Sequence, residues 1–102
     1  MTQRLIVRPE AESDIASAAQ WYEEQRPRLS LDFRAALDQT LSAIESRPEQ
    51  FARVYREFRR ALLRRFPYGV FYVQRAEGII VAAVFHTSRH PRLWRARFKP
   101  EG

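Results

Sequence analysis

Arginine gathers in two clusters in the second half of the chain. The first, residues 59–65, has a pair of arginines at each end of a short apolar run. The second, residues 86–97, holds four arginines, two histidines and a tryptophan. Guanidinium groups stay charged and bind phosphate or carboxylate oxygens in a bidentate manner, which lysine does not reproduce. The candidate binding residues are Arg59, Arg60, Arg64, Arg65, Arg89, Arg92, Trp94 and Arg95.

Nuclease chemistry on RNA would need more than arginine. One group must take the proton of the 2′-hydroxyl and another must protonate the leaving oxygen. Arginine stabilises negative charge but hardly exchanges protons, so only His86, His90 or a tyrosine could do this work. If the protein is a nuclease, its catalytic set is His86 with Arg60, Arg65 and Arg89. A strand-end histidine is more often held by a backbone group, so no catalytic residue is expected.

Several classes of site are excluded by residues that the sequence lacks. There is no cysteine, which removes disulfides and thiolate chemistry. The three glycines do not form a phosphate-binding loop, so nucleotide-dependent enzymes are excluded. Two histidines without a third ligand at metal spacing make a metal site improbable. We therefore expect no metal and no cofactor.

The two halves of the chain differ strongly in charge. Residues 1–50 hold six Arg and nine Asp or Glu, whereas residues 51–102 hold eleven Arg, one Lys and three Glu. The net charges are therefore −3 and +9. Such a block suits phosphates or acidic protein segments, and the alternative is a solvated surface without a partner.

Length and hydropathy predict one domain. A chain of 102 residues with 45% apolar content can bury a single core. Its longest apolar run, residues 79–85, is far shorter than the roughly 20 residues of a membrane helix. The apolar patch near the N-terminus is too short for export. We expect one domain over residues 1–102, with a basic C-terminal tail at 86–102, in the cytoplasm.

Two helices are predicted in the first half of the chain. Residues 4–8 form a short strand, and Pro9 then suits the first turn of a helix over residues 9–25. Apolar residues in this segment recur at steps of four, three and four. Ser30 is a plausible N-cap for a second helix that ends near Pro48. The two helices form an antiparallel hairpin.

Three strands are predicted in the second half, at residues 61–63, 70–73 and 79–85. Residues 79–85 are apolar at odd and even positions alike, so both faces of that strand should be covered. Alternation places Arg60 and Arg64 opposite Arg59 and Arg65, and one pair must face outward. In the tail, the large apolar anchors are Leu93, Trp94 and Phe98.

The predicted class is α+β, with the order β-α-α-β-β-β. The helical hairpin packs on one face of a small, mainly antiparallel sheet of four strands. The first strand lies beside the strand at residues 79–85 or at an edge of the sheet. If the two arginine clusters meet on the other face, they form one cationic surface.

The order and spacing of several short motifs resemble the ParE/RelE toxin superfamily over residues 5–97. The matching positions are Arg8-Pro9-Glu10-Ala11-Glu12, Asp14-Ile15, Trp21-Tyr22, Phe33, Ile44, Pro48, Arg60-Ala61-Leu62, Arg65-Phe66-Pro67-Tyr68, Tyr72, His86, Arg89, Pro91 and Trp94. The resemblance implies a toxin of a type II toxin-antitoxin system, neutralised by a cognate antitoxin in a hetero-oligomer. The acidic segment of such an antitoxin would be attracted by the basic half of the chain.

The superfamily has two main activities, which imply different residues. Members similar to RelE cleave mRNA in the ribosomal A site and carry an arginine after the turn tyrosine, whereas Tyr68 here is followed by Gly69. Arg89 matches the arginine of the last strand, but the family's C-terminal tyrosine has no counterpart. The ParE branch, associated with inhibition of DNA gyrase, is therefore favoured. A RelE-like mRNA endonuclease and a nucleic-acid-binding module are the alternatives.

Overall fold

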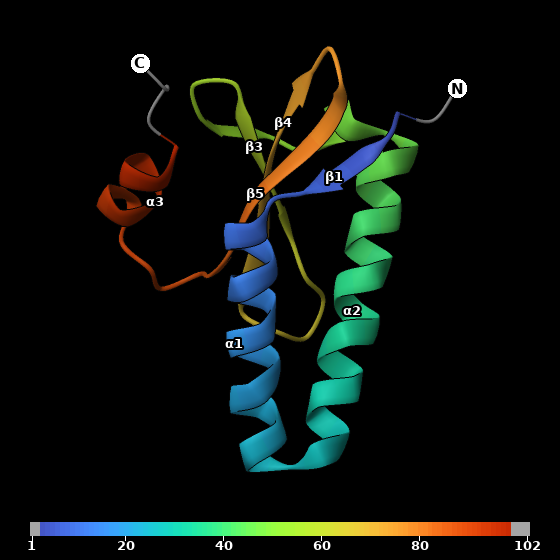
Figure 1. Ribbon diagram of the computed structural model, residues 1–102, viewed down its shortest axis with the longest axis vertical. Helices are drawn as coiled ribbons and strands as arrows, with labels where there is room; N and C mark the ends of the chain where they lie inside the picture. The colour runs from blue at the N-terminus through green and yellow to red at the C-terminus, as the bar shows by residue number, and fades with distance from the viewer. Residues whose placement is uncertain (1–2, 99–102) are drawn as a thin grey trace.

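The computed structural model describes residues 3–98 and shows a sheet with helices on both faces (Figure 1). The strand order is β1-β5-β4-β3-β2. The hairpin of α1 and α2 packs on one face, and α3 packs on the other. The elements are β1 (Leu5–Val7), α1 (Pro9–Gln25), α2 (Pro27–Ser46), the 3-10 turn η1 (Pro48–Gln50), β2 (Arg53–Tyr55), β3 (Phe58–Leu62), β4 (Tyr68–Arg75), β5 (Gly78–His86) and α3 (Pro91–Arg97).

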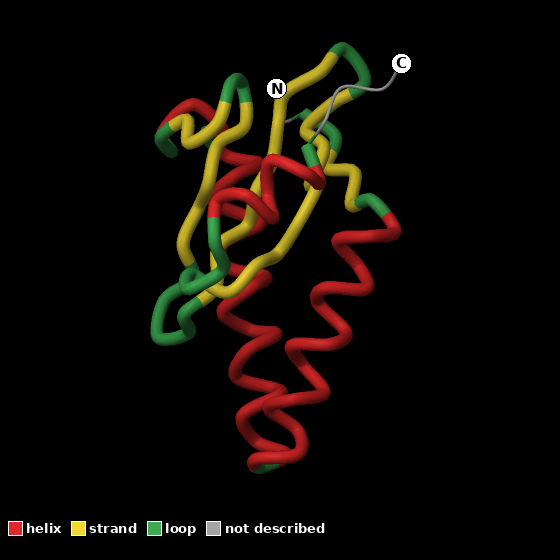
Figure 2. Tube along the Cα trace, turned by 90° about the vertical axis from the view of Figure 1, so that its left-hand side faces the viewer, coloured by secondary structure: helices red, strands yellow, loops and turns green. Residues whose placement is uncertain are grey.

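Proline begins both long helices. Pro9 opens α1 as predicted, and Pro27 opens α2 after Arg26 in an extended conformation. The prediction that Ser30 caps α2 is wrong, because Ser30 lies inside the helix and is buried. Proline pre-sets the helical φ and forces the preceding residue to be extended, so the helix starts at Pro27 without a side-chain cap. The helical hairpin extends beyond the sheet (Figure 2).

The sheet confirms the predicted meander and adds one strand. β3, β4 and β5 are antiparallel neighbours, and β1 lies parallel to β5 at the edge. The prediction of four strands missed β2, which pairs with β3 in an irregular register. β2 has only three residues, one of them an arginine, and they show no apolar alternation. The strand therefore forms because it pairs with β3, and its own sequence does not indicate it.

Side chains of β5 alternate between two cores, and a bulge shifts the alternation at Ala82. Tyr72 pairs with Val81 and Phe71 pairs with Ala83, so one residue of β5 has no partner in the register. Val81 packs with the core of α1 and α2, whereas Ala83 and Phe85 pack with the core under α3. Both faces of β5 are therefore buried, as the run of apolar residues predicted.

Aromatic side chains join the helical hairpin to the loop between β3 and β4. Tyr22 and Phe33 stack with ring centroids 5.3 Å apart, and Phe66 meets both rings edge-on. Tyr22 is buried, but its neighbour Trp21 is 54% exposed. Within residues 3–98, no helix has both the length and the apolar character needed to cross a membrane.

Tyr72 anchors η1 to the sheet. Its hydroxyl donates a hydrogen bond of 2.5 Å to the carbonyl oxygen of Pro48, and the side chain is fully buried. Burial raises the pKa of Tyr72 from 10.0 to about 12. The folded state therefore holds this proton more tightly than the unfolded chain does.

Alkaline pH should destabilise the protein through Tyr72. Because the folded pKa is raised, this contribution is complete below pH 10 and is lost as the pH rises toward 12. Tyr72→Phe should lower the free energy of unfolding at pH 7 by about 1 to 2 kcal/mol, since the Pro48 carbonyl loses its donor. Urea unfolding at pH 7, 10 and 11.5 measures both effects. If the free energy of unfolding of Tyr72→Phe fell between pH 10 and pH 11.5 as steeply as that of the wild type, this role of Tyr72 would be contradicted.

Candidate functional site

The predicted binding residues lie on two sides of the sheet. Five of these residues lie on α3 or beside it, and we call them the α3 arginine surface. They are Arg60, Arg89, Arg92, Trp94 and Arg95. The other three, Arg59, Arg64 and Arg65, lie on the side of α2 and η1. The sheet face opposite the helical hairpin is not an open cationic surface, because α3 covers part of it.

Arg60 lies between two aromatic rings. Its guanidinium carbon is 5.9 Å from the centroid of Phe71 and 5.8 Å from that of Trp94. Gly69, on the neighbouring strand, makes room for it, since a Cβ there would lie 2.9 Å from the Arg60 Cγ. The residue after Tyr68 is the one at which the resemblance to RelE-like nucleases would imply an arginine. The space that a side chain at Gly69 would need is filled here by the aliphatic part of Arg60.

Trp94 connects Arg60 to the loop before α3. Its indole N–H donates to the Arg89 carbonyl oxygen at 3.3 Å. The Arg89 guanidinium lies 4.6 Å from the centroid of Phe85, and that of Arg95 lies 5.7 Å from the centroid of Tyr55. Rings beneath these guanidinium groups hold them in place by cation–π attraction, and Arg89 and Arg95 are exposed.

The arginines of the α3 arginine surface form no ion pair in the described part of the chain. Among residues 3–98, ion pairs join Arg28 to Asp32, Arg75 to Glu57 and Arg97 to Asp14. None of these involves an arginine of the surface. These guanidinium groups are therefore not held by a carboxylate of the described chain and can bind phosphate or carboxylate groups of a partner.

Phe98 fastens α3 to the sheet. Its ring stacks on Phe58 at 4.4 Å between centroids and contacts Phe71 at 5.4 Å. Phe98 is buried and Trp94 is half-buried, which confirms them as anchors, but Leu93 is 53% exposed, so that part of the prediction is wrong. Only one face of the short helix can meet the sheet, and Leu93 lies on the other. The part of the predicted 86–102 tail after residue 98 lies outside the described residues.

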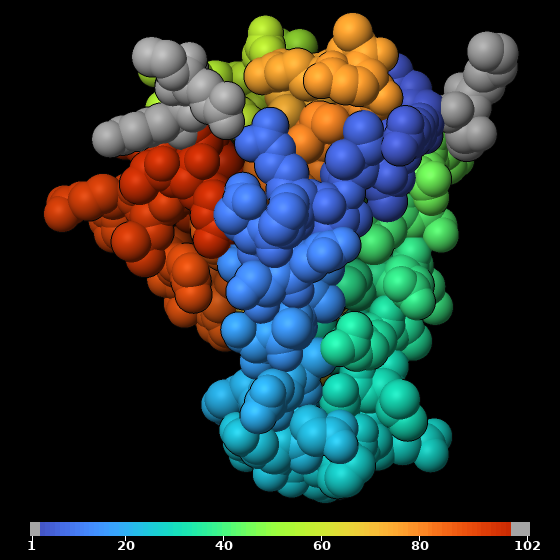
Figure 3. Space-filling view, viewed as in Figure 1, coloured from blue at the N-terminus to red at the C-terminus, as the bar shows by residue number. Residues whose placement is uncertain are grey.

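A second attachment of α3 was not predicted from the sequence. Asp14 on α1 accepts hydrogen bonds from Arg97 at 3.0 Å and from the Val84 backbone N–H at 3.0 Å. Arg97 also donates to the carbonyl oxygen of Ala82 at 3.2 Å. These backbone groups lie on β5 beyond its pairing with β1. The ion pair therefore supplies hydrogen-bond partners to the Val84 N–H and the Ala82 carbonyl oxygen at the open edge of β5. At this edge α3 and α1 lie side by side (Figure 3).

No sequence signal identifies this pair. Asp14 stands in the sequence analysis only among the positions that carry the family resemblance, and Arg97 only as one of the four arginines of residues 86–97. The two are 83 positions apart. Only the path of the chain brings them together.

His86 is the last residue of β5 and is held by the loop that follows. Its Nδ1 accepts the Ser88 backbone N–H at 3.0 Å and lies 2.7 Å from the Ser88 hydroxyl. Because the amide must donate, the neutral ring carries its proton on Nε2. The ring meets Tyr68 edge-on at 5.2 Å. Burial raises the pKa of Tyr68, and Arg89 nearby partly opposes this shift.

His90 is also used structurally. Its Nδ1 accepts the backbone N–H of Arg92, which caps α3.

Within residues 3–98, no group of three or more His, Asp or Glu side chains is placed to hold a metal ion.

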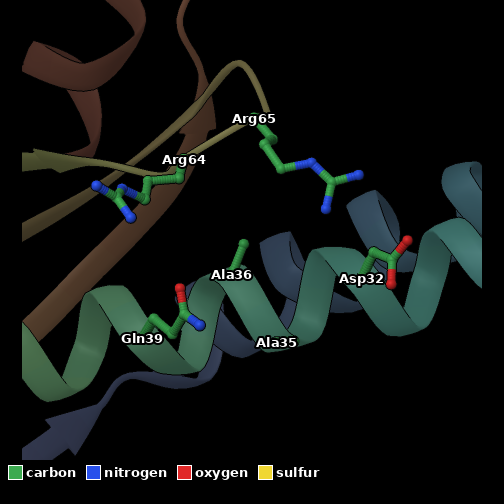
Figure 4. Close-up of a pocket in the computed structure, with 6 residues that line it drawn as sticks. All are labelled: Asp32, Ala35, Ala36, Gln39, Arg64 and Arg65. Carbon is green, nitrogen blue, oxygen red and sulfur yellow. The ribbon is translucent and has the colours of Figure 1, made fainter.

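The conditional nuclease set is divided between the two sides. His86 and Arg89 lie at the end of β5, and Arg60 lies on the α3 side of the sheet. Arg65 instead faces α2 (Figure 4). The geometry therefore does not bring Arg60 and Arg65 to one reacting centre.

The alternation predicted for the first arginine cluster holds only in part. Arg59 and Arg60 point to opposite faces, as expected. Arg59 donates to the carbonyl oxygens of Glu49 and Phe51, so it fastens η1. The prediction that Arg64 shares a side with Arg60 is wrong, because β3 ends at Leu62 and the chain turns toward α2.

Comparison with known proteins agrees with this fold. The family model described as ParE toxin of type II toxin-antitoxin system, parDE, matches residues 5–91. Toxin ParE2 of Mycobacterium tuberculosis, from strains CDC 1551 / Oshkosh and ATCC 25618 / H37Rv, is 30% identical over 92 residues, which is 89% of this chain and 88% of that protein. A structure described as the chromosomal ParDE TA system from P. aeruginosa superposes with a TM-score of 0.74 at 15% identity, covering 83% of this chain and 96% of that chain. The protein therefore belongs to the ParE toxin family of type II toxin-antitoxin systems.

Proposed function

We propose that this ParE-family toxin arrests growth in the cytoplasm by inhibiting DNA gyrase and is neutralised by binding a cognate antitoxin. The observation that carries the gyrase proposal is the α3 arginine surface. The guanidinium groups of Arg60, Arg89 and Arg95 lie on aromatic rings, and no arginine of the surface is ion-paired among residues 3–98. Such a surface is suited to binding a protein or DNA partner through fixed, charge-assisted hydrogen bonds.

Binding without catalysis is favoured because, among residues 3–98, the members of the conditional nuclease set do not converge on one centre. The Nδ1 of His86 is occupied by Ser88, and the nearby arginines cannot exchange protons. Arg60 and Arg65 also face different sides of the sheet. These observations support a toxin that blocks its target by contact.

Neutralisation by an antitoxin is supported by charge. Residues 51–102 carry a net charge of +9, which would steer an acidic segment to the toxin and hold it there. If the antitoxin segment is disordered when free, the folded cationic toxin offers a template on which it can fold.

A supercoiling assay with purified toxin and DNA gyrase tests the proposal. Wild-type toxin should block supercoiling and leave cleaved DNA. Replacing both Arg89 and Arg95 with alanine should raise the inhibitory concentration about tenfold or more. The matched control is Arg34→Ala, an exposed arginine on α2, which should inhibit like the wild type.

Two outcomes would overturn the gyrase proposal. Unchanged supercoiling at excess toxin, together with mRNA cut on programmed ribosomes, would make the protein a RelE-like nuclease. Unchanged supercoiling together with salt-dependent binding to DNA or RNA would make it a nucleic-acid-binding module. The antitoxin proposal is tested separately, by whether the small protein encoded beside this toxin restores growth.

A further inference from the structure

The loop that joins β5 to α3 (Figure 1) holds a serine hydroxyl against a histidine ring. The Ser88 Oγ lies 2.7 Å from the Nδ1 of His86, and this nitrogen also accepts the Ser88 backbone N–H at 3.0 Å. Because the backbone N–H can only donate, Nδ1 carries a lone pair, and the hydroxyl donates its hydrogen to it as well. Ser88 therefore has a base within hydrogen-bond reach, as a nucleophilic serine requires.

Two backbone hydrogen bonds keep this pair in place. The Arg89 N–H donates to the His86 carbonyl oxygen at 3.0 Å, which closes a tight turn around Ser88. The Thr87 N–H donates to the Pro67 carbonyl oxygen at 2.8 Å, which ties the turn to the loop between β3 and β4. The histidine is half-buried, whereas the serine is exposed. A small reagent can therefore reach the hydroxyl while the ring beside it stays fixed.

The second histidine of the same loop shows an arrangement that only supports the fold. The Nδ1 of His90 accepts the Arg92 backbone N–H at 3.0 Å, with the same spacing of two residues, but Arg92 has no hydroxyl to offer. The Thr40 hydroxyl donates to the Ala36 carbonyl oxygen, which is not a base. Among the side-chain hydrogen bonds of residues 3–98, only that of Ser88 joins a hydroxyl to a basic nitrogen.

The surroundings of Ser88 are cationic. Arg89 follows it directly, with its guanidinium carbon 4.6 Å from the centroid of Phe85, and Arg92 lies at the start of α3. Both arginines are exposed. Neither they nor His86 take part in an ion pair among residues 3–98. A reagent that carries negative charge is therefore attracted to this loop.

We propose that Ser88 is a site of covalent modification, at which His86 acts as the general base and an acyl phosphate supplies the acyl group. The Ser88 oxygen attacks the carbonyl carbon of the acyl phosphate while its proton moves to the His86 Nδ1. The bond between carbon and the serine oxygen forms, and the bond between carbon and the phosphate oxygen breaks. The proton then passes from His86 to the phosphate that leaves. The product is an O-acyl serine, and nothing is oxidised or reduced.

The test uses the full-length protein with acetyl phosphate as the probe. The protein is digested after incubation, and mass spectrometry locates and quantifies the acetyl groups. Ser42, an exposed serine on α2, is the internal reference because no histidine is bonded to its hydroxyl. Ser88 should be acetylated at least about tenfold faster than Ser42, since a positioned base speeds the removal of the hydroxyl proton.

Two matched substitutions identify the base. His86→Asn keeps an acceptor for the Ser88 backbone N–H, because asparagine bonds the amide two residues on, but its side-chain oxygen is not a base. Acetylation of Ser88 should then fall about tenfold or more, to the rate of Ser42. His90→Asn makes the same change at the neighbouring histidine and keeps the cap of α3, so the rate should stay within about twofold of the wild type. Circular dichroism shows whether both variants are folded.

Three results would overturn the proposal. Acetylation of Ser88 no faster than that of Ser42 in the wild type would show that the hydroxyl is not activated. A wild-type rate in folded His86→Asn would exclude the histidine as the base. A phosphoryl group on Ser88 in place of an acetyl group would exclude acyl transfer. None of these measurements uses gyrase or an antitoxin, so their outcome is independent of the proposed function.

Discussion

Replacing Asp14 with alanine is expected to lower the free energy of unfolding by about 3 kcal/mol, because Arg97 is left as a largely buried charge without a carboxylate partner. The two side chains are only 14% and 26% exposed, so water screens their attraction weakly. The substitution also removes the acceptor for the Val84 amide on the edge of β5. Urea unfolding monitored by circular dichroism measures the loss.

Two further variants separate charge from hydrogen bonding. Asp14→Asn keeps an oxygen for the Val84 amide and should cost less, about 1 to 2 kcal/mol. Arg75→Ala removes an ion pair with Glu57 that is exposed, and it should cost below about 1 kcal/mol. Equal losses for Asp14→Ala and Arg75→Ala would show that the pair at the β5 edge contributes no more than a surface contact.

Phe98→Ala should detach α3 from the sheet. The ring is 5% exposed and stacks on Phe58, and truncating a phenylalanine in such a place costs about 3 to 4 kcal/mol. A helix at one end of the described chain can separate while the rest stays folded, so the loss should appear mainly as local opening. Hydrogen exchange should show α3 amides close to unprotected while those of β4 and β5 remain slow.

The control for this prediction is Leu93→Ala on the exposed side of α3. It should change stability by less than about 0.5 kcal/mol and leave the protection of α3 as in the wild type. The same detachment should weaken gyrase inhibition by Phe98→Ala, because Arg92 and Arg95 are carried by α3. Full protection of α3 amides in Phe98→Ala would show that the ion pair alone holds the helix.

Much of the fold could be predicted because its signals are local. The apolar spacing in α1 and the two-sided apolar run of β5 come from residues close together in the chain. What was missed depends on contacts between distant segments. β2 forms only because β3 offers it an edge, and α2 starts at Pro27 although Ser30 looked like a better cap.

The candidate site was predicted less completely than the fold. The arginines were recognisable by type, but alternation along β3 could not show that the chain turns at Arg65 toward α2. Nor could composition show that Arg60 lies between Phe71 and Trp94 and so belongs with α3. The hollow between α2 and the two arginines Arg64 and Arg65 was not expected, because Ala35 and Ala36 on its α2 side carry no chemical signal of their own.

The sequence by itself determined the α+β class, the order of the main elements, the concentration of charge in the second half and the resemblance to the toxin family. These follow from residue type and from spacing over a few turns or strands, where neighbours in the chain are also neighbours in space. The tertiary structure alone decided how the arginines divide between the two sides of the sheet and that Asp14 meets Arg97 at the edge of β5. Such contacts join residues many positions apart, and they are set by the packing of whole elements, which local patterns do not encode.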